Sequence, residues 1–433
     1  MRQRDKPGRP SYRVLSSTAI WVGAIVLTVV AAGSVWLLLA TFGSDPKSSF
    51  RLEIIKAAVT VVVGTGGATA LLLAARRQRF VELDGTERRI TDLQTKAADQ
   101  LGSDKAAVRL AGLYALERLA QDNPSHRQTI VDVMCAYLRM PYTPPPERPA
   151  ALRSTASLRP RRPAWMRPQP ISADATTNDD RRQEHQVRLT AQRILAAHLE
   201  PDPRKRGGKP TNPKFWPNID LDLTGATLLE FDLKHCRLRT GTFTSARFIG
   251  HAWFDGAAFT KDAWFDRTAF TADVRFGGVT FTGDAWFDGT TFTKDAWFGE
   301  VTFTEEAHFN STTFTGDAWF GSTAFNRDGW FNKATFISAA WFEGAAFTSA
   351  ARFNSTTFAS TVSFEGATFA EEIRFGRAHA RVVFGLASSV WPPGWVLGDA
   401  AAMPQDAPST HEGTWHPLTP SYTKGSPQNP EQL

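Results

Sequence analysis

Large apolar residues recur at fixed short intervals in the C-terminal part of the chain. A step of five residues leads from Leu223 through Leu228 to Phe243, and from Phe248 to Phe375 the step alternates between six and five. Neither the 3.6-residue period of a helix nor the alternation of a plain strand produces these steps. A fixed period over such a length predicts a solenoid of stacked coils that turns a corner after every repeat.

The phenylalanine excess has its origin in this period. Twenty-five of the 31 Phe residues belong to the series, and the residue two positions before each of them is nearly always small. A large ring and a small side chain at this offset can both point inward and interlock. We therefore expect a structural ladder of interior rings, with Phe265, Phe276, Phe287, Phe298, Phe309, Phe320, Phe331 and Phe342 at its centre.

Two segments carry a resemblance to a known family. Residues 223–228 match the five-residue unit A(D/N)(L/F)xx, and residues 281–292 match an eleven-residue Phe variant with one extra residue in alternate corners. Residues 219–375 thus resemble a pentapeptide-repeat protein. The resemblance implies an all-β repeat solenoid, a right-handed quadrilateral parallel β-helix with one repeat on each side. The series then fills about seven coils, a rod of roughly 34 Å at the usual strand spacing.

The N-terminal part has a different pattern. Residues 18–42 and 57–75 are apolar runs without an ionisable side chain, long enough for transmembrane helices 1 and 2. Residues 1–17 form a basic N-terminus, and basic residues also follow the second run. The positive-inside rule then places both termini in the cytoplasm of a multi-pass protein of the cell inner (plasma) membrane, with membrane lipid as a partner. The whole arrangement resembles membrane-anchored actinobacterial pentapeptide-repeat proteins.

A helical period indicates a cytoplasmic helical module over 84–140 and an amphipathic helix over 181–200. Residues Ser125 to Gln128 have the spacing of a capping box, which predicts the start of the module's last helix. Between the two regions, 141–180 is rich in Pro and Arg and is expected to be a disordered linker, attracted to anionic lipid or simply soluble. After the repeats we expect a C-terminal cap at 376–397 and a disordered tail at 398–433.

An outward position recurs every eleven residues, directly before every second Phe. With 22 residues in a coil, its occupants divide onto two opposite faces of the rod. Aromatic ladders of this size are candidate interaction faces. Stacking that only stiffens the rod is the alternative reading. The tryptophans at this position are Trp253, Trp264, Trp286, Trp297, Trp319, Trp330 and Trp341.

Charge is distributed unevenly along the chain. The whole sequence has a formal net charge of +6, whereas residues 211–380 hold 14 Lys and Arg against 20 Asp and Glu. Solvated corners explain this acidity without a function. The position three residues before every second Phe is acidic in eight of twelve cases, namely Asp262, Asp273, Asp284, Asp295, Glu306, Asp317, Asp328 and Glu372.

The sequence shows no catalytic constellation. Cys135 and Cys236 are too few for a disulfide framework or a Cys-rich zinc site, and the nine His residues contain no HExxH pair. We therefore expect no enzyme activity, no catalytic or metal-binding residue and no cofactor. The favoured function is a membrane-anchored, cytoplasmic-facing scaffold for an unknown protein partner.

The alternative function is an acidic rod that mimics nucleic acid and interacts with topoisomerase, as some pentapeptide-repeat proteins do. Direct binding of nucleic acid is not favoured, because the Arg/Pro linker lacks an aromatic platform. A homo-oligomer formed through the rod ends stays open.

Overall fold

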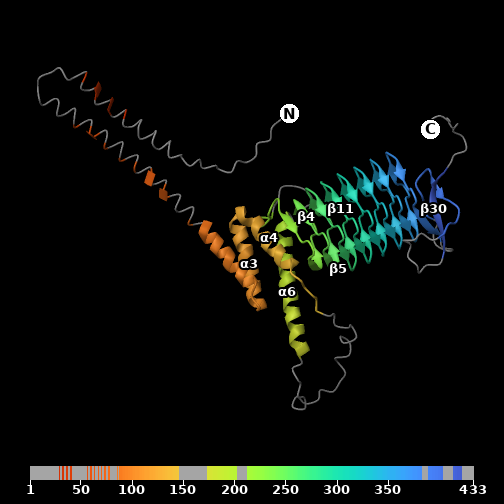
Figure 1. The fold of residues 1–433 in the computed structure, drawn as a ribbon, viewed down its shortest axis with the longest axis horizontal. Helices are drawn as coiled ribbons and strands as arrows, with labels where there is room; N and C mark the ends of the chain where they lie inside the picture. Colours follow the sequence, from red (N-terminus) through yellow and green to blue (C-terminus); the bar gives the residue numbers. More distant parts are fainter. Residues whose placement is uncertain are drawn as a thin grey trace, which may run out of the picture. The chain divides into compact units, whose positions relative to one another are not determined.

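The computed structural model of the 433-residue chain describes residues 87–145, 173–201, 212–382, 389–402 and 413–421, and isolated positions before residue 87. The chain divides into two compact units, Met1–Thr91 and Asp92–Leu433. The described positions of the first unit are helical. The second unit contains the helices and the solenoid that Figure 1 shows.

The prediction of two transmembrane helices is wrong for this fold. No helix among the described residues is long and apolar enough to cross a membrane. Crossing takes about 20 consecutive apolar residues, whereas charged side chains interrupt the described helices, as in Ala173–Leu199. Most positions of 18–42 and 57–75 lie outside the described residues. The membrane localisation and the lipid partner, which rest on those segments, stay predictions.

The repeat region is a parallel β-solenoid of about seven turns, as the series of Phe residues predicted. One turn consists of four two-residue strands, for example β10, β11, β12 and β13, and we name the four sides of the solenoid after these strands. On each side a residue pairs with the residue 22 positions later, as Trp297 does with Trp319. The β10 side lies opposite the β12 side, and the β11 side lies opposite the β13 side.

Each side is a parallel sheet or part of one. The β11 side consists of β1 (Asp220–Asp222), β4 (Thr240–Thr242), β7 (Ala263–Trp264), β11 (Ala285–Trp286), β15 (Ala307–His308), β19 (Gly329–Trp330), β23 (Ala351–Arg352) and β27 (Ile373–Arg374). The β10 side consists of β3 (Arg237–Leu238), β6 (Ala258–Phe259), β10 (Thr280–Phe281), β14 (Thr302–Phe303), β18 (Ala324–Phe325), β22 (Ala346–Phe347) and β26 (Thr368–Phe369).

The other two sides share one sheet, because the long strand β5 (Arg247–Trp253) continues around a corner and pairs with both β8 and β9. The β13 side continues with β9 (Val274–Arg275), β13 (Ala296–Trp297), β17 (Ala318–Trp319), β21 (Ala340–Trp341) and β25 (Val362–Ser363), and β2 (Thr227–Asp232) pairs with β5 at its start. The β12 side continues with β8 (Ala269–Phe270), β12 (Thr291–Phe292), β16 (Thr313–Phe314), β20 (Thr335–Phe336), β24 (Thr357–Phe358) and β28 (His379–Val382).

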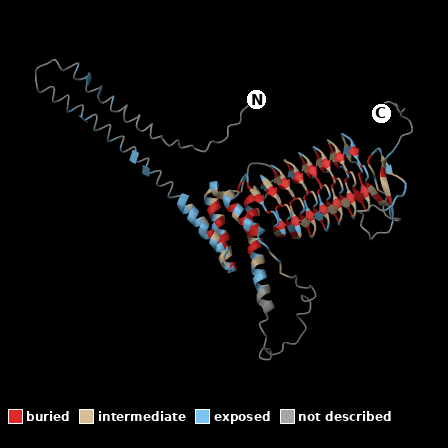
Figure 2. Cartoon of the chain, viewed as in Figure 1, coloured by how far each residue is buried: buried red, intermediate tan, exposed pale blue. Residues whose placement is uncertain are grey.

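The interior is a set of phenylalanine stacks, and Figure 2 shows the buried residues following the inside of every turn. Rings 22 residues apart lie parallel with centroids 4.5–5.2 Å apart, from the Phe248–Phe270 pair to the Phe336–Phe358 pair. The eight rings expected at the centre of the ladder are completely buried. The expected pairing of an inward ring with a small residue two positions earlier is confirmed, for example at Ala285 and Phe287.

Some of the small inward residues are threonines, whose buried hydroxyls need hydrogen-bond acceptors. The Oγ1 atoms of Thr268, Thr312 and Thr356 each donate to the carbonyl of the Phe 25 residues earlier, at 2.7 Å. These bonds join neighbouring turns inside the core. A threonine at this position therefore adds an inter-turn bond that an alanine cannot make.

Two kinds of corner alternate around the turn. On the β11 and β13 sides an inward Phe follows each outward residue. The residue two positions after this Phe has a positive φ, between +53° and +67°, at every eleventh position from Ser245 to Arg377. The opposite corners contain the extra residue that lengthens the step from five to six. The alternation of steps in the sequence is thus an alternation of corner geometries.

Helices close the N-terminal end of the solenoid. They are α3 (Ala106–Asp122), α4 (Arg127–Arg139) and α6 (Ala173–Leu199), with the 3-10 turn η1 (Pro124–His126) between the first two. Helix α4 contacts β1 and β2, and α6 contacts β2. Helix α6 begins at Ala173, whereas the sequence placed its start at 181. Of the predicted linker 141–180, residues 146–172 lie outside the described residues.

Two glutamine side chains join these helices to the first strands. The Gln128 amide donates to the carbonyl of Asp220 and accepts from its N–H, both at 3.0 Å. The Gln192 amide does the same with Leu229, at 2.7 and 3.1 Å. Each amide thus takes the place of a neighbouring strand at the open edge. The capping box at Ser125–Gln128 is absent, because Gln128 pairs with Asp220 and α4 has no side-chain cap.

Buried polar contacts hold the helices together. Arg188, which is 2% exposed, donates to the carbonyls of Leu138 and Met140 and to the carboxylate of Glu184. His198 is 1% exposed, stacks on Trp216 and contacts the Glu117 carboxylate at 2.8 Å. These contacts join α3, α4 and α6 into one layer against the solenoid.

The C-terminal end is closed by Trp391 and two antiparallel strands. The Trp391 ring contacts the rings of Phe358, Phe364 and Phe375, which end their stacks. Strand β30 (Thr414–Pro420) pairs with β28 and with β29 (Trp395–Leu397). The structure therefore has a strand inside the segment 398–433, for which the sequence predicted a disordered tail, because β30 completes the edge that β28 leaves open.

Replacing Phe298 with Ala is expected to cost about 3–5 kcal/mol of unfolding free energy, because the cavity is lined by rings that cannot close over it. Phe298 stacks between Phe276 and Phe320 at 4.8 and 4.9 Å. Urea denaturation measures the loss. Phe369→Ala is the matched control with a smaller expected loss, since Phe369 lies in the last strand of its side. A loss below about 1 kcal/mol for Phe298→Ala contradicts an interior role.

Replacing Gln192 with Met is expected to cost about 1–3 kcal/mol, because the N–H and C=O of Leu229 lose their partners in a buried place. The comparison is Gln186→Met, one of the exposed positions of the same helix. Thermal unfolding of both variants separates the two cases. Equal stability of the two proteins would show that the Gln192 amide is not needed at the strand edge.

Candidate interaction surfaces

The β13 side presents a ladder of indoles. Trp297, Trp319 and Trp341 are in register on β13, β17 and β21. Their rings stack with centroids 5.0 and 5.3 Å apart and planes within 18° of one another. Trp253 and Arg275 occupy the two preceding rungs of the same side.

The β11 side presents a mixed ladder of aromatic and basic side chains. His308 stacks on Trp286 with ring centroids 3.7 Å apart, and Trp330 follows at 6.0 Å. The Arg352 guanidinium lies over the Trp330 ring, 4.2 Å from its centroid. Trp264 begins this series on β7, in register with Trp286. The ladder on this side is thus more polar than the one on the β13 side.

The stacking decides which part of each indole is accessible. A rung between two neighbours has both ring faces covered, so its outer edge is what a partner can reach. Most of the seven tryptophans are half-buried, and Trp297 is 39% exposed. The structure therefore brings the sequence-predicted residues together in two ladders. Their role as interaction faces stays a prediction.

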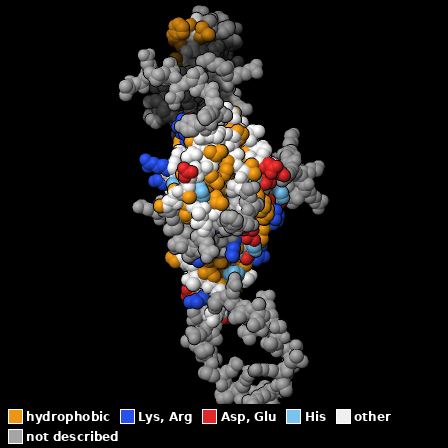
Figure 3. All heavy atoms as spheres, turned by 90° about the vertical axis from the view of Figure 1, so that its right-hand side faces the viewer, with side chains coloured by type: hydrophobic (Ala, Val, Ile, Leu, Met, Phe, Trp, Pro, Cys, Tyr) orange, Lys and Arg blue, Asp and Glu red, His pale blue; other side chains and the backbone are white. Residues whose placement is uncertain are grey.

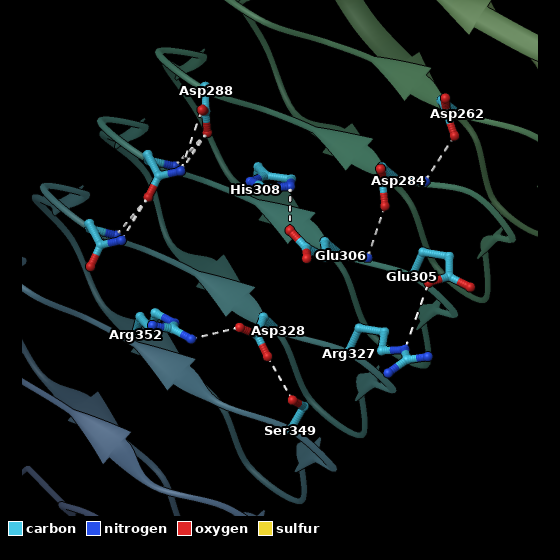
Figure 4. A network of polar contacts seen from close by, with 12 residues as sticks. Asp262, Asp284, Asp288, Glu305, Glu306, His308, Arg327, Asp328, Ser349 and Arg352 are labelled. Atoms are coloured by element: carbon cyan, nitrogen blue, oxygen red, sulfur yellow. Dashed lines mark hydrogen bonds and ion pairs between the residues drawn. The ribbon is translucent and has the colours of Figure 1, made fainter.

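The acidic corner residues have a structural role that the sequence analysis missed. The Oδ1 atoms of the six aspartates among them accept hydrogen bonds from the backbone N–H of the residue 22 positions later, as Asp262 does from Asp284 at 3.1 Å (Figure 4). The same bond recurs at Asp273, Asp284, Asp295, Asp317 and Asp328. These carboxylates join consecutive turns. Their recurrence at eight of the twelve equivalent positions was the signal for this role.

A second polar ladder lies at the corner after the β11 side. The side-chain amides of Asn310, Asn332 and Asn354 each donate to the side-chain oxygen one turn earlier, at 2.9–3.2 Å, beginning at Asp288. One turn before Asp288 stands Asp266, a second carboxylate. Burial raises the pKa of Asp266, and the charge of Asp288 raises it further. The ladder thus starts with a repulsive pair.

Ion pairs support the β11 side. Asp328 accepts from Arg352 at 2.8 Å and from Ser349 at 2.6 Å, which holds the guanidinium over Trp330. Burial alone raises the pKa of Asp328, but these hydrogen bonds and the charge of Arg352 lower it overall. Figure 4 also shows Glu306 against His308, at 3.2 Å. Asp328 is thus paired within the rod, whereas Glu306 forms an ion pair only with a protonated His308.

The described residues offer little for catalysis. Cys135 and Cys236 are both buried, and burial raises the pKa of the Cys135 thiol to about 12, far from a reactive thiolate. No cluster of His, Cys, Asp or Glu in the described part of the chain can hold a metal ion. At the C-terminal end, Figure 3 shows hydrophobic, acidic and basic side chains interspersed.

A comparison with known protein families supports the repeat that the sequence indicated. Residues 223–269, 265–313, 298–345 and 309–357 match the family model of pentapeptide repeats (nine copies). No curated protein and no solved structure matches the chain. Residues 223–357 of the solenoid are therefore similar to pentapeptide repeats. The membrane-anchored actinobacterial type stays a prediction.

Replacing Asp288 with Asn is expected to stabilise the protein at neutral pH by about 0.5 kcal/mol, since like charges directly opposite one another are destabilising. The new amide donates to Asp266 and keeps the oxygen that Asn310 uses. Because the pKa of the Asp266 carboxyl group is raised in the folded protein, its ionised form destabilises the folded state. The repulsion is therefore absent at low pH, and it grows as the pH rises from the unfolded pKa of about 3.9 through the folded pKa.

Unfolding free energies between pH 3 and pH 7 measure this effect. As the pH rises through that range, the wild-type protein should become less stable relative to Asp288→Asn. Asp399→Asn changes the net charge equally at an exposed position and serves as the control. Parallel pH profiles for all three proteins would contradict the repulsive pair.

Proposed function

We propose that the protein is a non-catalytic scaffold for protein–protein interaction, and that a partner binds over the edge of Trp297 on the β13 side. One observation carries the proposal. Trp297 is the tryptophan that is exposed within the described solenoid, at 39%. Tryptophan is enriched among the residues that dominate binding energy at protein interfaces.

The surroundings of Trp297 support its accessibility. Gly277, Gly299 and Gly321 stand at the corner that follows the β13 side, two positions after the rungs 275, 297 and 319. A Cβ atom added at Gly299 would meet only the Gly321 carbonyl oxygen, at 3.7 Å. The corner therefore has free space at Gly299 and Gly321, beside the edges of Trp297 and Trp319, where a partner can approach them.

The opposite ladder is less suited to the same role. Arg352 covers the Trp330 ring, and His308, which is 8% exposed, is stacked on Trp286. Fully buried interface centres are depleted in charged residues. For this reason the β13 side, and not the β11 side, is the proposed docking face.

A scaffold also agrees with the class of fold. Repeat solenoids present extended surfaces, and pentapeptide-repeat solenoids are generally structural or interaction proteins without enzymatic activity. The nucleic-acid mimic has weaker support, because corner carboxylates such as Asp295 and Asp317 are bonded to backbone N–H groups of the next turn. Pairing of two copies through the rod ends stays a prediction.

Replacing Trp297 with Arg is expected to weaken partner binding about 30-fold, as the loss of a dominant interface residue does, without loss of fold. Arg is chosen because Arg275 already occupies a rung of the same ladder. A photo-crosslinking amino acid at position 300, next to the indole corner, identifies the partner in cells, and its affinity for both proteins is then measured.

Trp330→Arg is the matched control, a rung of the opposite ladder that already contacts Arg352. It should leave the affinity unchanged. Equal affinities for wild-type, Trp297→Arg and Trp330→Arg proteins would show that the indole edges only stiffen the rod. Unfolding midpoints of all three identify any variant that fails to fold.

A further inference from the structure

A cavity lies where helix α6 meets the first turns of the solenoid. It has a volume of about 540 Å³ and is lined by α6 on one side and by residues of β2, β5 and the segment after β2 on the other. We call it the junction pocket. Of the tryptophans in the two ladders, only Trp253, the first one on the β13 side, lines the pocket. It is therefore a site distinct from the Trp297 edge.

The ring of Trp253 forms a wall of the junction pocket and already holds a cation. The Lys234 ammonium lies 4.6 Å from the centroid of the Trp253 ring. Asp232, the rung that pairs with Trp253, binds the same ammonium at 3.3 Å. Trp253 is the first tryptophan of the β13 side. The Lys234 ammonium lies on its ring face, where a neighbouring indole lies farther along the ladder.

The charges of the lining favour a cation over an anion. Three carboxylates, of Glu200, Glu230 and Asp232, face two permanent cations, Arg193 and Lys234. Glu230 is held at the pocket by the N–H of His251, at 3.3 Å, and lies against Gly250, where a Cβ atom would come within 2.1 Å of its carboxylate. A positive group over an indole face is attracted by the ring quadrupole, most strongly when it is partly desolvated.

We propose that the junction pocket binds the alkylammonium group of a ligand, which replaces the Lys234 ammonium on the face of Trp253. The side chain of Lys234 is 41% exposed, so it can swing toward solvent and leave its place to the ligand. The pocket then offers the ligand an aromatic wall, the Asp232 carboxylate and the neighbouring acidic groups. The group can come from a small amine or from a lysine side chain of a protein.

Two probes distinguish these sources, choline and the peptide acetyl-Gly-Lys-Gly-amide. Their affinities for the full chain are measured by saturation-transfer NMR. Replacing Lys234 with Met removes the internal competitor, so the affinity of each probe that binds should rise about fivefold, a typical size for one cation–π contact. Lys294→Met, at an exposed corner position, is the matched control and should change nothing. Binding of either probe alone supports the proposal and identifies the source.

Replacing Trp253 with Leu in the Lys234→Met protein should return the affinity to the wild-type value or below it. The unfolding midpoint of each variant separates loss of binding from loss of fold. The proposal is overturned if Lys234→Met does not tighten binding, if the Trp253→Leu change has no effect, or if acetyl-glutamate competes with choline for the pocket. A failure at Trp297 leaves this result unaffected, because Trp297 is two rungs from Trp253 and is not part of the pocket lining.

Discussion

The structure depends on one constraint, that every inward ring must meet the ring one turn later at stacking distance. Parallel strands are about 4.8 Å apart, and the Phe centroids are 4.5–5.2 Å apart. The spacing of the backbone and the thickness of a phenyl ring therefore agree, so both hydrogen bonds and ring contacts are satisfied with 22 residues in a turn. A turn of a different length would bring the rings out of register. This explains why the steps of six and five continue from Phe248 to Phe375.

The same constraint shapes the outside of the rod. Any residue type that recurs every 22 positions is stacked on itself, whether or not it binds anything. Indoles stack on indoles, asparagines donate to asparagines, and aspartates accept from the backbone of the next turn. A recurrent residue on such a rod is therefore weak evidence of binding. Exposure and departures from the repeat are better evidence, which is why Trp297 and Trp253 carry the two proposals.

Most of the solenoid could be predicted from the sequence, because its contacts lie at a constant separation that a one-dimensional pattern reveals. The buried ladder at Phe298 and the division of the tryptophans onto two sides follow from counting. The bonds of Gln128 could not be predicted in this way, since its partner Asp220 is 92 residues away and outside the period. The inter-turn bonds of the acidic corners depend on the direction of a side chain, which spacing alone does not determine. The transmembrane helices were inferred from hydropathy alone, without any contact pattern to support them.

The ends of the rod impose a different requirement from its middle. Within a stack of equal turns each strand covers the next, so the sides of the described solenoid are flat. The first turn has no preceding turn, and helices α4 and α6 close it with glutamine amides in place of strands. A straight helix cannot follow the corners of a four-sided coil, so the contact between them is incomplete. The junction pocket occupies this gap. It lies beside Trp253, the first tryptophan of the β13 side, whose partner on the preceding strand is Asp232 and not an indole. In this fold a pocket for a ligand thus forms where the repetition stops.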